Sequence, residues 1–142
     1  MLKVIVLTLA TTNICLADIN FECLVKNVYY EARGEEEAGW AAVAKVTINR
    51  AQKYKKPVCA IVYEPRQFSW TSKKGRSKIK EEELYKEIKE FCRKFVRSPQ
   101  AFLAVGESVL YFHKVGHAKP AWTKKMRRVA RIGKHIFYEA RD

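Results

Sequence analysis

The segment that decides the fold is residues 27–54, which read NVYYEARGEEEAGWAAVAKVTINRAQKY. Gly34 divides it into two runs. In the first run, apolar residues at helical spacing predict a helix over residues 18–33, with Asp18 at its N-cap. The second run predicts a helix over residues 37–54 with one apolar face. That face consists of Trp40, Val43, Ala44, Thr47, Ile48 and Ala51.

Outward from this segment, the pattern predicts a further helix and a late sheet. Periodicity is lost over residues 57–75, which indicates a structured loop, and it returns as a helix with a charged, solvated face over residues 79–97. A short helix is expected over residues 99–106. Residues 109–113 and 132–138 predict two short strands joined by a basic loop. This order indicates a mainly helical α+β domain with a small two- or three-stranded antiparallel sheet.

Length and charge limit the classes of protein that fit. The chain has 142 residues, with 28 Lys and Arg against 15 Asp and Glu, and a net charge of +13. An apolar content of 48% fits one compact domain and excludes a disordered or collagen-like chain. The charge predicts a polyanionic partner, which can be nucleic acid, anionic lipid or an anionic cell-wall polymer.

Residues 1–17 have the features of a short signal peptide, with Lys3 before an apolar run and a predicted cleavage after Ala17. The run is too short for a membrane-spanning helix, although an uncleaved weak anchor is the alternative. We therefore expect a monomeric mature domain of residues 18–142, exported to the periplasm, the cell wall or the cell exterior, without a stable membrane span. Export favours wall polymers over nucleic acid as partners.

The mature domain contains three cysteines, Cys23, Cys59 and Cys92. Three cysteines permit at most one internal disulfide and leave an odd thiol. None belongs to a Cys-x-x-Cys pair of the kind that binds zinc or does redox chemistry. Buried or singly bridged cysteines are the expected outcome.

The three histidines, His113, His117 and His135, raise the alternative of a zinc site. On a helix, two histidines four residues apart share a face and can bind one metal, but Gly116 and the strand-like residues before it argue against a helix there. No Glu follows His113 as it does in a His-Glu-x-x-His motif. The sequence therefore predicts no metal and no other cofactor.

The acidic cluster around Gly34 contains the candidate catalytic group, Glu31. It occupies the last turn of the predicted apolar helix, where burial and the negative end of the helix dipole both raise the pKa of a carboxyl group. A carboxyl group that stays protonated near neutral pH is suited to act as a general acid in glycosidic cleavage. A surface charge, or a salt bridge to Arg33, is the alternative.

Several segments together resemble the SleB-type cell wall hydrolases, a family that includes spore cortex-lytic enzymes and phage wall hydrolases. Their order and approximate spacing agree over most of residues 22–138. The segments are residues 27–35, 39–50, 58–63, 67–70, 111–113 and 132–138. The resemblance implies a small lysozyme-like fold and cleavage of the glycan strand of peptidoglycan, and a phage product of this family would act on the host cell wall. It carries the single catalytic glutamate of the family over to Glu31, with Glu35 as the nearest rival.

Whether a second catalytic carboxylate is available distinguishes the possible reactions. A hydrolytic glycosidase normally uses two carboxylates, and the body of the domain offers no Asp, only Glu35, Glu36, Glu37 or Glu64. A lytic transglycosylase needs one group, because the 6-hydroxyl of muramic acid replaces water. The sequence therefore favours a lytic transglycosylase-type muramidase. The alternatives are an N-acetylmuramoyl-L-alanine amidase and a non-catalytic basic protein that binds cell wall or nucleic acid.

The other matched residues suit the binding of sugar rings, because aromatic faces pack on pyranoses and amides or hydroxyls bind their substituents. One side of the predicted groove consists of Gln67, Phe68, Ser69 and Trp70, and the other of Tyr111, His113, His135 and Tyr138. Glu35 is a further candidate for substrate binding. Phe68 and Phe137 are expected to belong to the core instead, and Asn49 to bind backbone.

Overall fold

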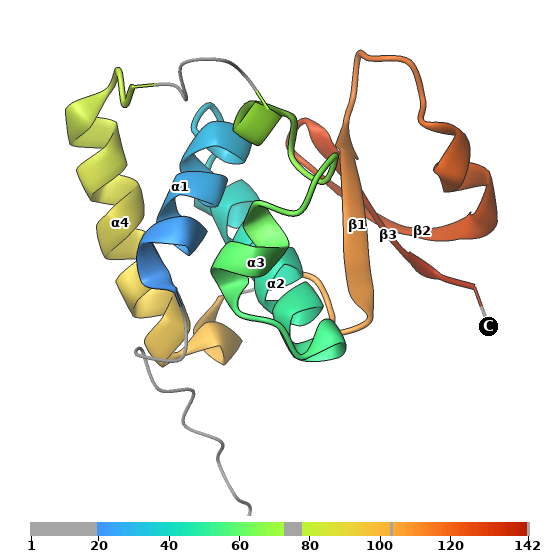
Figure 1. Cartoon of the computed structure of the whole chain (residues 1–142), viewed down its shortest axis with the longest axis horizontal. Helices are drawn as coiled ribbons and strands as arrows, with labels where there is room; N and C mark the ends of the chain where they lie inside the picture. The colour runs from blue at the N-terminus through green and yellow to red at the C-terminus, as the bar shows by residue number, and fades with distance from the viewer. Residues whose placement is uncertain (1–19, 73–77, 103, 142) are drawn as a thin grey trace, which may run out of the picture.

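The structure, a computed structural model, describes residues 20–72, 78–102 and 104–141, and the predicted leader and Asp18 lie outside these ranges. A group of helices packs against one face of a three-stranded antiparallel sheet (Figure 1). The helices are α1 (Phe21–Ala32), α2 (Glu37–Tyr54), α3 (Val58–Val62) and α4 (Glu82–Arg97). Within the described ranges, no helix is both long and apolar enough to span a bilayer.

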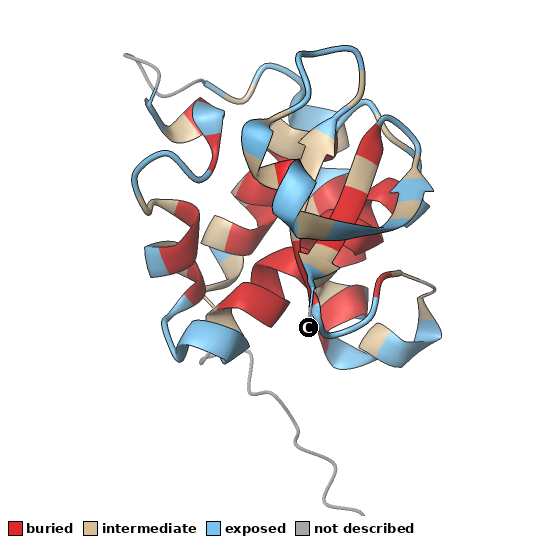
Figure 2. Cartoon of the chain, turned by 90° about the vertical axis from the view of Figure 1, so that its right-hand side faces the viewer, coloured by how far each residue is buried: buried red, intermediate tan, exposed pale blue. Residues whose placement is uncertain are grey.

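The predicted helices on either side of Gly34 are confirmed as α1 and α2, with Asn20 at the N-cap position of α1. The expectation of one apolar face on α2 was too narrow. From Gly39 to Arg50 every residue except Lys45 is buried. The reason is that α2 is the central element, in contact with α1, α3 and α4 and with strands β1 and β2. Buried residues gather where the helices pack against one another and against the sheet (Figure 2). Its alanines let these neighbours approach closely.

Three short elements differ from the predicted pattern. The segment over residues 57–75 is not simply a loop, because it contains α3 and the 3-10 turn η1 (Ser69–Ser72). The helix expected over residues 99–106 is only the 3-10 turn η2 (Pro99–Ala101). Such short helices bury few apolar residues, so they produce little periodicity in the sequence.

The sheet has three strands, β1 (Val109–Lys114), β2 (Met126–Ile132) and β3 (His135–Ala140), in the order β1-β3-β2. The predicted first strand is confirmed. The segment predicted as a second strand instead contains the end of β2, a turn at Gly133 with φ +55°, and most of β3. The basic loop between the two predicted strands thus includes β2. This edge strand escaped prediction because its arginines are exposed and interrupt the apolar alternation.

The register divides the side chains of β1 and β3 between two faces. The inner face, toward the helices, carries Phe112, Lys114, His135 and Phe137. The outer face carries Tyr111, His113, Ile136 and Tyr138. Asn49 of α2 fixes the start of β1, because its Nδ2 donates to the carbonyl oxygens of Gly106 and Val109, each at 2.9 Å. The predicted backbone role of Asn49 and the core position of Phe137 are confirmed.

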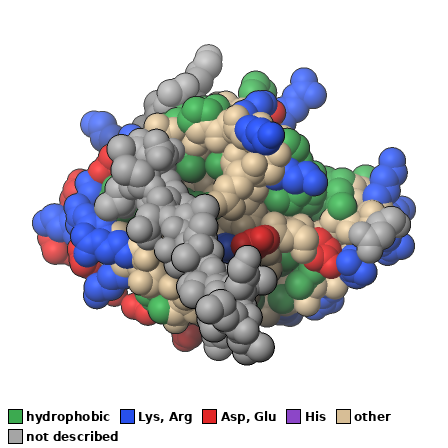
Figure 3. Space-filling model, turned by 90° about the horizontal axis from the view of Figure 1, so that it is seen from below, with side chains coloured by type: hydrophobic (Ala, Val, Ile, Leu, Met, Phe, Trp, Pro, Cys, Tyr) green, Lys and Arg blue, Asp and Glu red, His purple; other side chains and the backbone are tan. Residues whose placement is uncertain are grey.

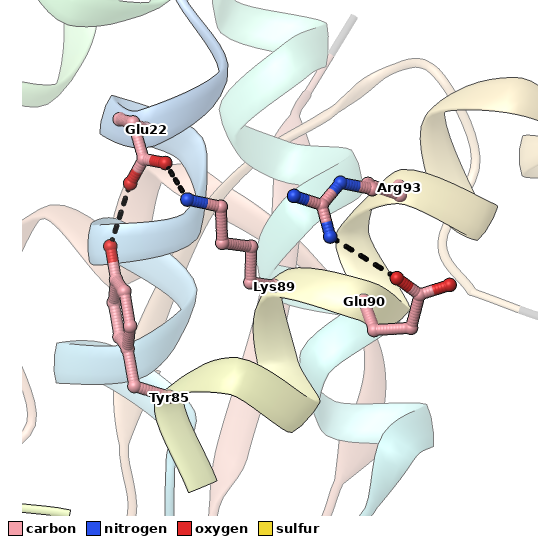
Figure 4. Close-up of polar contacts among 5 residues, drawn as sticks. All are labelled: Glu22, Tyr85, Lys89, Glu90 and Arg93. Atoms are coloured by element: carbon pink, nitrogen blue, oxygen red, sulfur yellow. Dashed lines mark hydrogen bonds and ion pairs between the residues drawn. The ribbon is translucent and has the colours of Figure 1, made fainter. Parts of the chain in front are cut away.

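Covalent and ionic contacts join the remaining helices to α1. A disulfide links Cys23 of α1 to Cys59 of α3, and Cys92 of α4 is a buried free thiol whose pKa burial raises to about 12. On the surface, Glu22 of α1 accepts a hydrogen bond from Tyr85 at 2.9 Å and pairs with Lys89 of α4 (Figure 4). The charges of α4 therefore lie on a solvated face, as predicted, and pair with carboxylates.

The disulfide generates a prediction about stability. Replacing both Cys23 and Cys59 by Ala should lower the free energy of unfolding by about 4 kcal/mol, because the bridge closes a segment with a sequence separation of 36 and restricts the unfolded chain. Urea unfolding of the oxidised protein and of the double variant measures the difference. A reductant that leaves the unfolding midpoint of the unsubstituted protein unchanged would contradict the prediction.

Candidate active site

Glu31 lies in the last turn of α1, and the end of that helix is held in place by α2. The indole Nε1 of Trp40 donates to the carbonyl oxygen of Ala32 at 2.9 Å, and the backbone N–H of Glu35 donates to the same oxygen at 2.9 Å. These bonds satisfy a carbonyl that the helix end would leave unpaired. The position of Glu31 is therefore fixed by backbone contacts rather than by its own side chain.

One turn earlier, the buried amide of Asn27 joins three parts of the chain. Its Nδ2 donates to Oγ1 of Thr47 in α2 at 3.0 Å, and its Oδ1 accepts from Nε1 of Trp70 in η1 at 2.9 Å. The ring of Trp70 also stacks on Tyr30, with 4.5 Å between centroids. The segment that ends in Trp70 thus lies beside the helix that carries Glu31.

The environment of Glu31 makes its carboxyl group a weaker acid than usual. Burial raises its pKa from 4.5 to about 7, and the charge of Lys114 on the inner face of β1 lowers it only in part. No described residue forms a hydrogen bond or ion pair with this carboxyl group. The alternative of a salt bridge to Arg33 is wrong, because Arg33 pairs with Glu81 at 3.1 Å.

Glu35, the rival in the same motif, has a packed and hydrogen-bonded side chain. Its Oε1 accepts from the backbone N–H of Lys134 at 2.9 Å, in the turn between β2 and β3. A Cβ added to Gly133 would lie 2.1 Å from Oε2 of Glu35, and one added to Gly39 would lie 2.6 Å from its Cβ. Two glycines therefore make room for this side chain, which ties the turn after α1 to the sheet.

His135 is buried on the inner face, next to Glu35. Its Nδ1 lies 3.5 Å from Oε1 of Glu35 without forming a hydrogen bond, and burial lowers the pKa of its ring. A buried imidazole with a lowered pKa favours the neutral form. His135 thus contributes to the core between the sheet and the turn after α1.

Arg50 is a central residue of the site that sequence reasoning passed over. Its guanidinium is buried, donates to Oε1 of Gln67, and lies 5.8 Å from the ring centroids of Phe68 and Tyr111. Oε2 of Glu64 lies 3.9 Å from Nη2 of Arg50 and balances its charge. The only sequence signal for this role is a cation within a run of residues that proves to be buried. Arg50 joins both predicted sides of the site to α2.

The predicted substrate-binding residues occupy different environments. Gln67 and Ser69 are exposed, whereas Phe68 and Trp70 are buried, which confirms the predicted core position of Phe68. The second predicted side is divided by the sheet. Tyr111, His113 and Tyr138 lie on the outer face, where Nε2 of His113 and the hydroxyl of Tyr138 are 2.9 Å apart, and His135 lies on the inner face.

The positions of the histidines in the sheet bear on the alternative of a zinc site. Strand alternation directs His113 and His135 to opposite faces of the sheet. Among the residues that the structure describes, no three His, Cys, Asp or Glu side chains are grouped so that they could hold a metal ion.

The fold and the site define a small α+β domain in which the partly buried carboxyl group of Glu31, at the end of α1, has a raised pKa. Residues 34–138 match the model of the Cell Wall Hydrolase family, and the chain belongs to that family. The match begins at Gly34, so Glu35 lies inside it and Glu31 three residues before it.

Similar proteins agree with this classification. The chain is 30% identical over 118 residues to the spore cortex-lytic enzyme of Bacillus subtilis (strain 168), and 28% identical over 123 residues to that of Halalkalibacterium halodurans. These alignments cover 82% and 85% of this chain but only 36% and 35% of the relatives. The chain thus spans about a third of the length of these two curated relatives.

A solved structure of similar fold is the catalytic domain of the germination-specific lytic transglycosylase SleB from Bacillus anthracis. The TM-score is 0.65 at 25% identity, over 94% of this chain and 100% of that domain. The catalytic domain of the Bacillus cereus SleB protein gives a TM-score of 0.62 at 25% identity, over 90% and 97% of the two chains. The mainly helical fold with a small late sheet is that of these domains.

The raised pKa of Glu31 predicts a gain in stability when its charge is removed. Between pH 4.5 and about 7 the unfolded chain releases this proton while the folded chain retains it, so folding stability falls as the pH rises through that window. Glu31→Gln should therefore be more stable than the unsubstituted protein by roughly 1–3 kcal/mol at pH 8, with little difference at pH 4.

Chemical denaturation at the two pH values measures this difference. Glu87→Gln, an exposed position on α4, is the matched control and should show no such pH-dependent gain. A Glu31→Gln variant that is no more stable than the unsubstituted protein at pH 8 would show that the Glu31 carboxylate is well solvated.

Proposed function

We propose that this chain cleaves the glycan strand of peptidoglycan as a lytic transglycosylase, with Glu31 as its general acid and base. The observation that carries the proposal is the partly buried carboxyl group of Glu31, whose pKa of about 7 leaves a large protonated fraction at neutral pH. A general acid is most effective when its pKa lies near the working pH. Membership of the Cell Wall Hydrolase family supports the substrate class.

The reaction requires two proton transfers at one carboxyl group. Glu31 gives its proton to the glycosidic oxygen as the bond from that oxygen to C1 of muramic acid breaks. The carboxylate then takes the proton of the 6-hydroxyl while the oxygen of that hydroxyl forms a bond to C1. The products are a shortened glycan and a 1,6-anhydromuramic end, and Glu31 is protonated again. Lys114 stabilises the carboxylate between the two steps, since its charge favours the ionised form.

The other carboxylates have contacts that support a single-acid reaction. Glu35 accepts from the backbone of Lys134 and packs against glycines. Glu64 lies 3.8 Å from Lys56 and 3.9 Å from Arg50. Glu36 and Glu37 are exposed at the start of α2. The Bacillus anthracis domain of similar fold is itself described as a lytic transglycosylase, which supports the same chemistry here.

The proposal also covers where in the cell the protein acts. We infer an exported protein that meets peptidoglycan and its associated anionic polymers outside the cytoplasmic membrane, with residues 1–17 as the leader. The Glu31 assignment rests on helix position and burial. The amidase and the non-catalytic binding protein remain as outcomes of the experiments below.

Replacing Glu31 by Gln removes the titratable proton and keeps the size of the side chain, so clearing of a purified cell-wall suspension should fall by roughly 10²- to 10⁴-fold. Glu35→Gln is the matched control. It retains the carbonyl oxygen that can accept from Lys134 and should lose much less activity. Turbidity decay with both variants, after circular dichroism has shown intact folds, provides the comparison. A reversed order of the two losses would assign the acid to Glu35.

The products of purified peptidoglycan distinguish the reactions. We expect soluble fragments with 1,6-anhydromuramic ends by mass spectrometry, because the 6-hydroxyl is tethered to the reacting sugar and attacks with the advantage of proximity. Reducing muramic ends, heavier by one water, would show hydrolysis with a second carboxylate. Stem peptides released from intact glycan, with loss of activity in a chelator, would show an amidase. No release of fragments would leave the binding protein.

A further inference from the structure

The outer face of the sheet carries an aromatic cluster built around Trp122. This residue belongs to the 3-10 turn η3 (Ala121–Lys125), which folds back over the strands. Its ring lies 5.6 Å from Tyr111, 6.1 Å from His113 and 5.4 Å from Tyr138, measured between centroids. The three contacts come from two strands, so Trp122 is seated on the sheet.

The turn that presents Trp122 is well tied down. Oγ1 of Thr123 donates to the carbonyl oxygen of Pro120 at 2.7 Å, and the backbone N–H of Thr123 donates to the same oxygen at 3.1 Å. The chain has three tryptophans, and Trp122 differs from the other two in its exposure. Trp40 and Trp70 are 4% and 6% exposed, whereas Trp122 is only partly buried. An indole held in place with part of its ring exposed is suited to pack against a ligand.

Two arginines of β2 border this cluster on the same face. Arg128 pairs in register with Tyr138, and Arg131 with Ile136, so both project from the outer face. Both are exposed, and no described carboxylate forms an ion pair with either. Their neighbour Arg127 differs, because it pairs with Glu139 at 2.6 Å. Nε of Arg131 donates to the carbonyl oxygen of Gly133 at 3.2 Å, which leaves its two terminal nitrogens, like the guanidinium of Arg128, without a described carboxylate and available to an anion.

The charge around the cluster is strongly one-sided. Residues 114–141 contain nine Lys and Arg but a single acidic residue, Glu139. On α4, by contrast, Lys86, Lys89 and Arg93 each pair with a glutamate. Figure 3 shows carboxylates among the basic side chains on the α4 side of the molecule and Lys and Arg gathered at the sheet end. The sheet end therefore attracts polyanions more strongly than α4 does.

We propose that Trp122, Arg128 and Arg131 form a second binding surface for a peptidoglycan strand, separate from the Glu31 site. The indole packs against the apolar face of a hexosamine ring, and the guanidinium groups bind carboxylates of the stem peptides. Glu31 and its neighbour Lys114 lie on the helix side of the sheet, so this surface holds a different stretch of polymer from the one being cleaved. The identity of the ligand rests on the proposed function.

Binding to insoluble sacculi tests the surface without cleavage. The full chain carrying Glu31→Gln is cosedimented with purified peptidoglycan sacculi, alone and combined with Arg128→Gln and Arg131→Gln. Loss of both arginines should weaken binding by roughly fivefold or more, as for well-placed arginines in other interfaces. The charge-matched control is Lys94→Gln with Arg97→Gln, two exposed positions of α4, which should change binding by less than about twofold.

Quenching of tryptophan fluorescence supplies a second measurement that needs no substitution on the sheet. Soluble glycan strands with stem peptides should reduce acrylamide quenching in the Glu31→Gln protein, because Trp122 is the one partly exposed tryptophan. Addition of the ligand to a Trp122→Phe variant should produce no such protection. Equal quenching with and without the strands would overturn the proposal.

Other outcomes are equally decisive. Equal losses of sacculus binding in the two arginine pairs, or no loss in either, would show that general charge rather than this surface binds the wall. Duplex DNA or anionic lipid vesicles that bind more tightly than sacculi, with the same dependence on Arg128 and Arg131, would assign the surface to another partner. If the unsubstituted protein releases no fragments while sacculus binding still requires these arginines, the cleavage proposal fails and the surface stands.

Discussion

The side-chain amide of Asn27 is the contact on which the arrangement of the site depends. It is buried between α1, α2 and η1, and it donates to Thr47 while accepting from Trp70. A buried amide without partners is costly, so these two hydrogen bonds stabilise the observed relative placement of the three elements. That placement brings the segment ending in Trp70 beside the last turn of α1. The environment of Glu31, four residues further along the same helix, follows from it.

Two glutamates four residues apart show how the same side chain can take different roles. Glu35 is enclosed by the turn of the β2–β3 hairpin and by glycines at positions 39 and 133, and its carboxylate is hydrogen bonded to backbone. Glu31 is partly buried and has no such partner among the described residues, so desolvation acts on its charge and raises its pKa. The contacts of Glu35 support a structural role that joins sheet to helices. Those of Glu31 support acid–base chemistry.

Spacing and resemblance together were sufficient for the fold class and for the position of Glu31 at a helix end, because an apolar helix produces a strong period in the sequence. They failed where the burial of a residue does not follow from its polarity. β2 is an edge strand with exposed arginines and therefore looks like a loop. Arg50 is buried because Gln67 and Glu64 solvate its charge, and these partners are distant in sequence. The split of His113 from His135 needed the register of β1 with β3.

The central claim concerns one carboxyl group, and its pKa can be measured directly. In the full chain with ¹³C-labelled glutamate, the side-chain carboxyl resonance that disappears in the Glu31→Gln variant identifies Glu31, and its chemical shift is followed as a function of pH. We predict a midpoint near 7, well above the usual 4.5. A midpoint close to 4.5 for this resonance, or a raised midpoint that persists in the Glu31→Gln variant, would contradict the account.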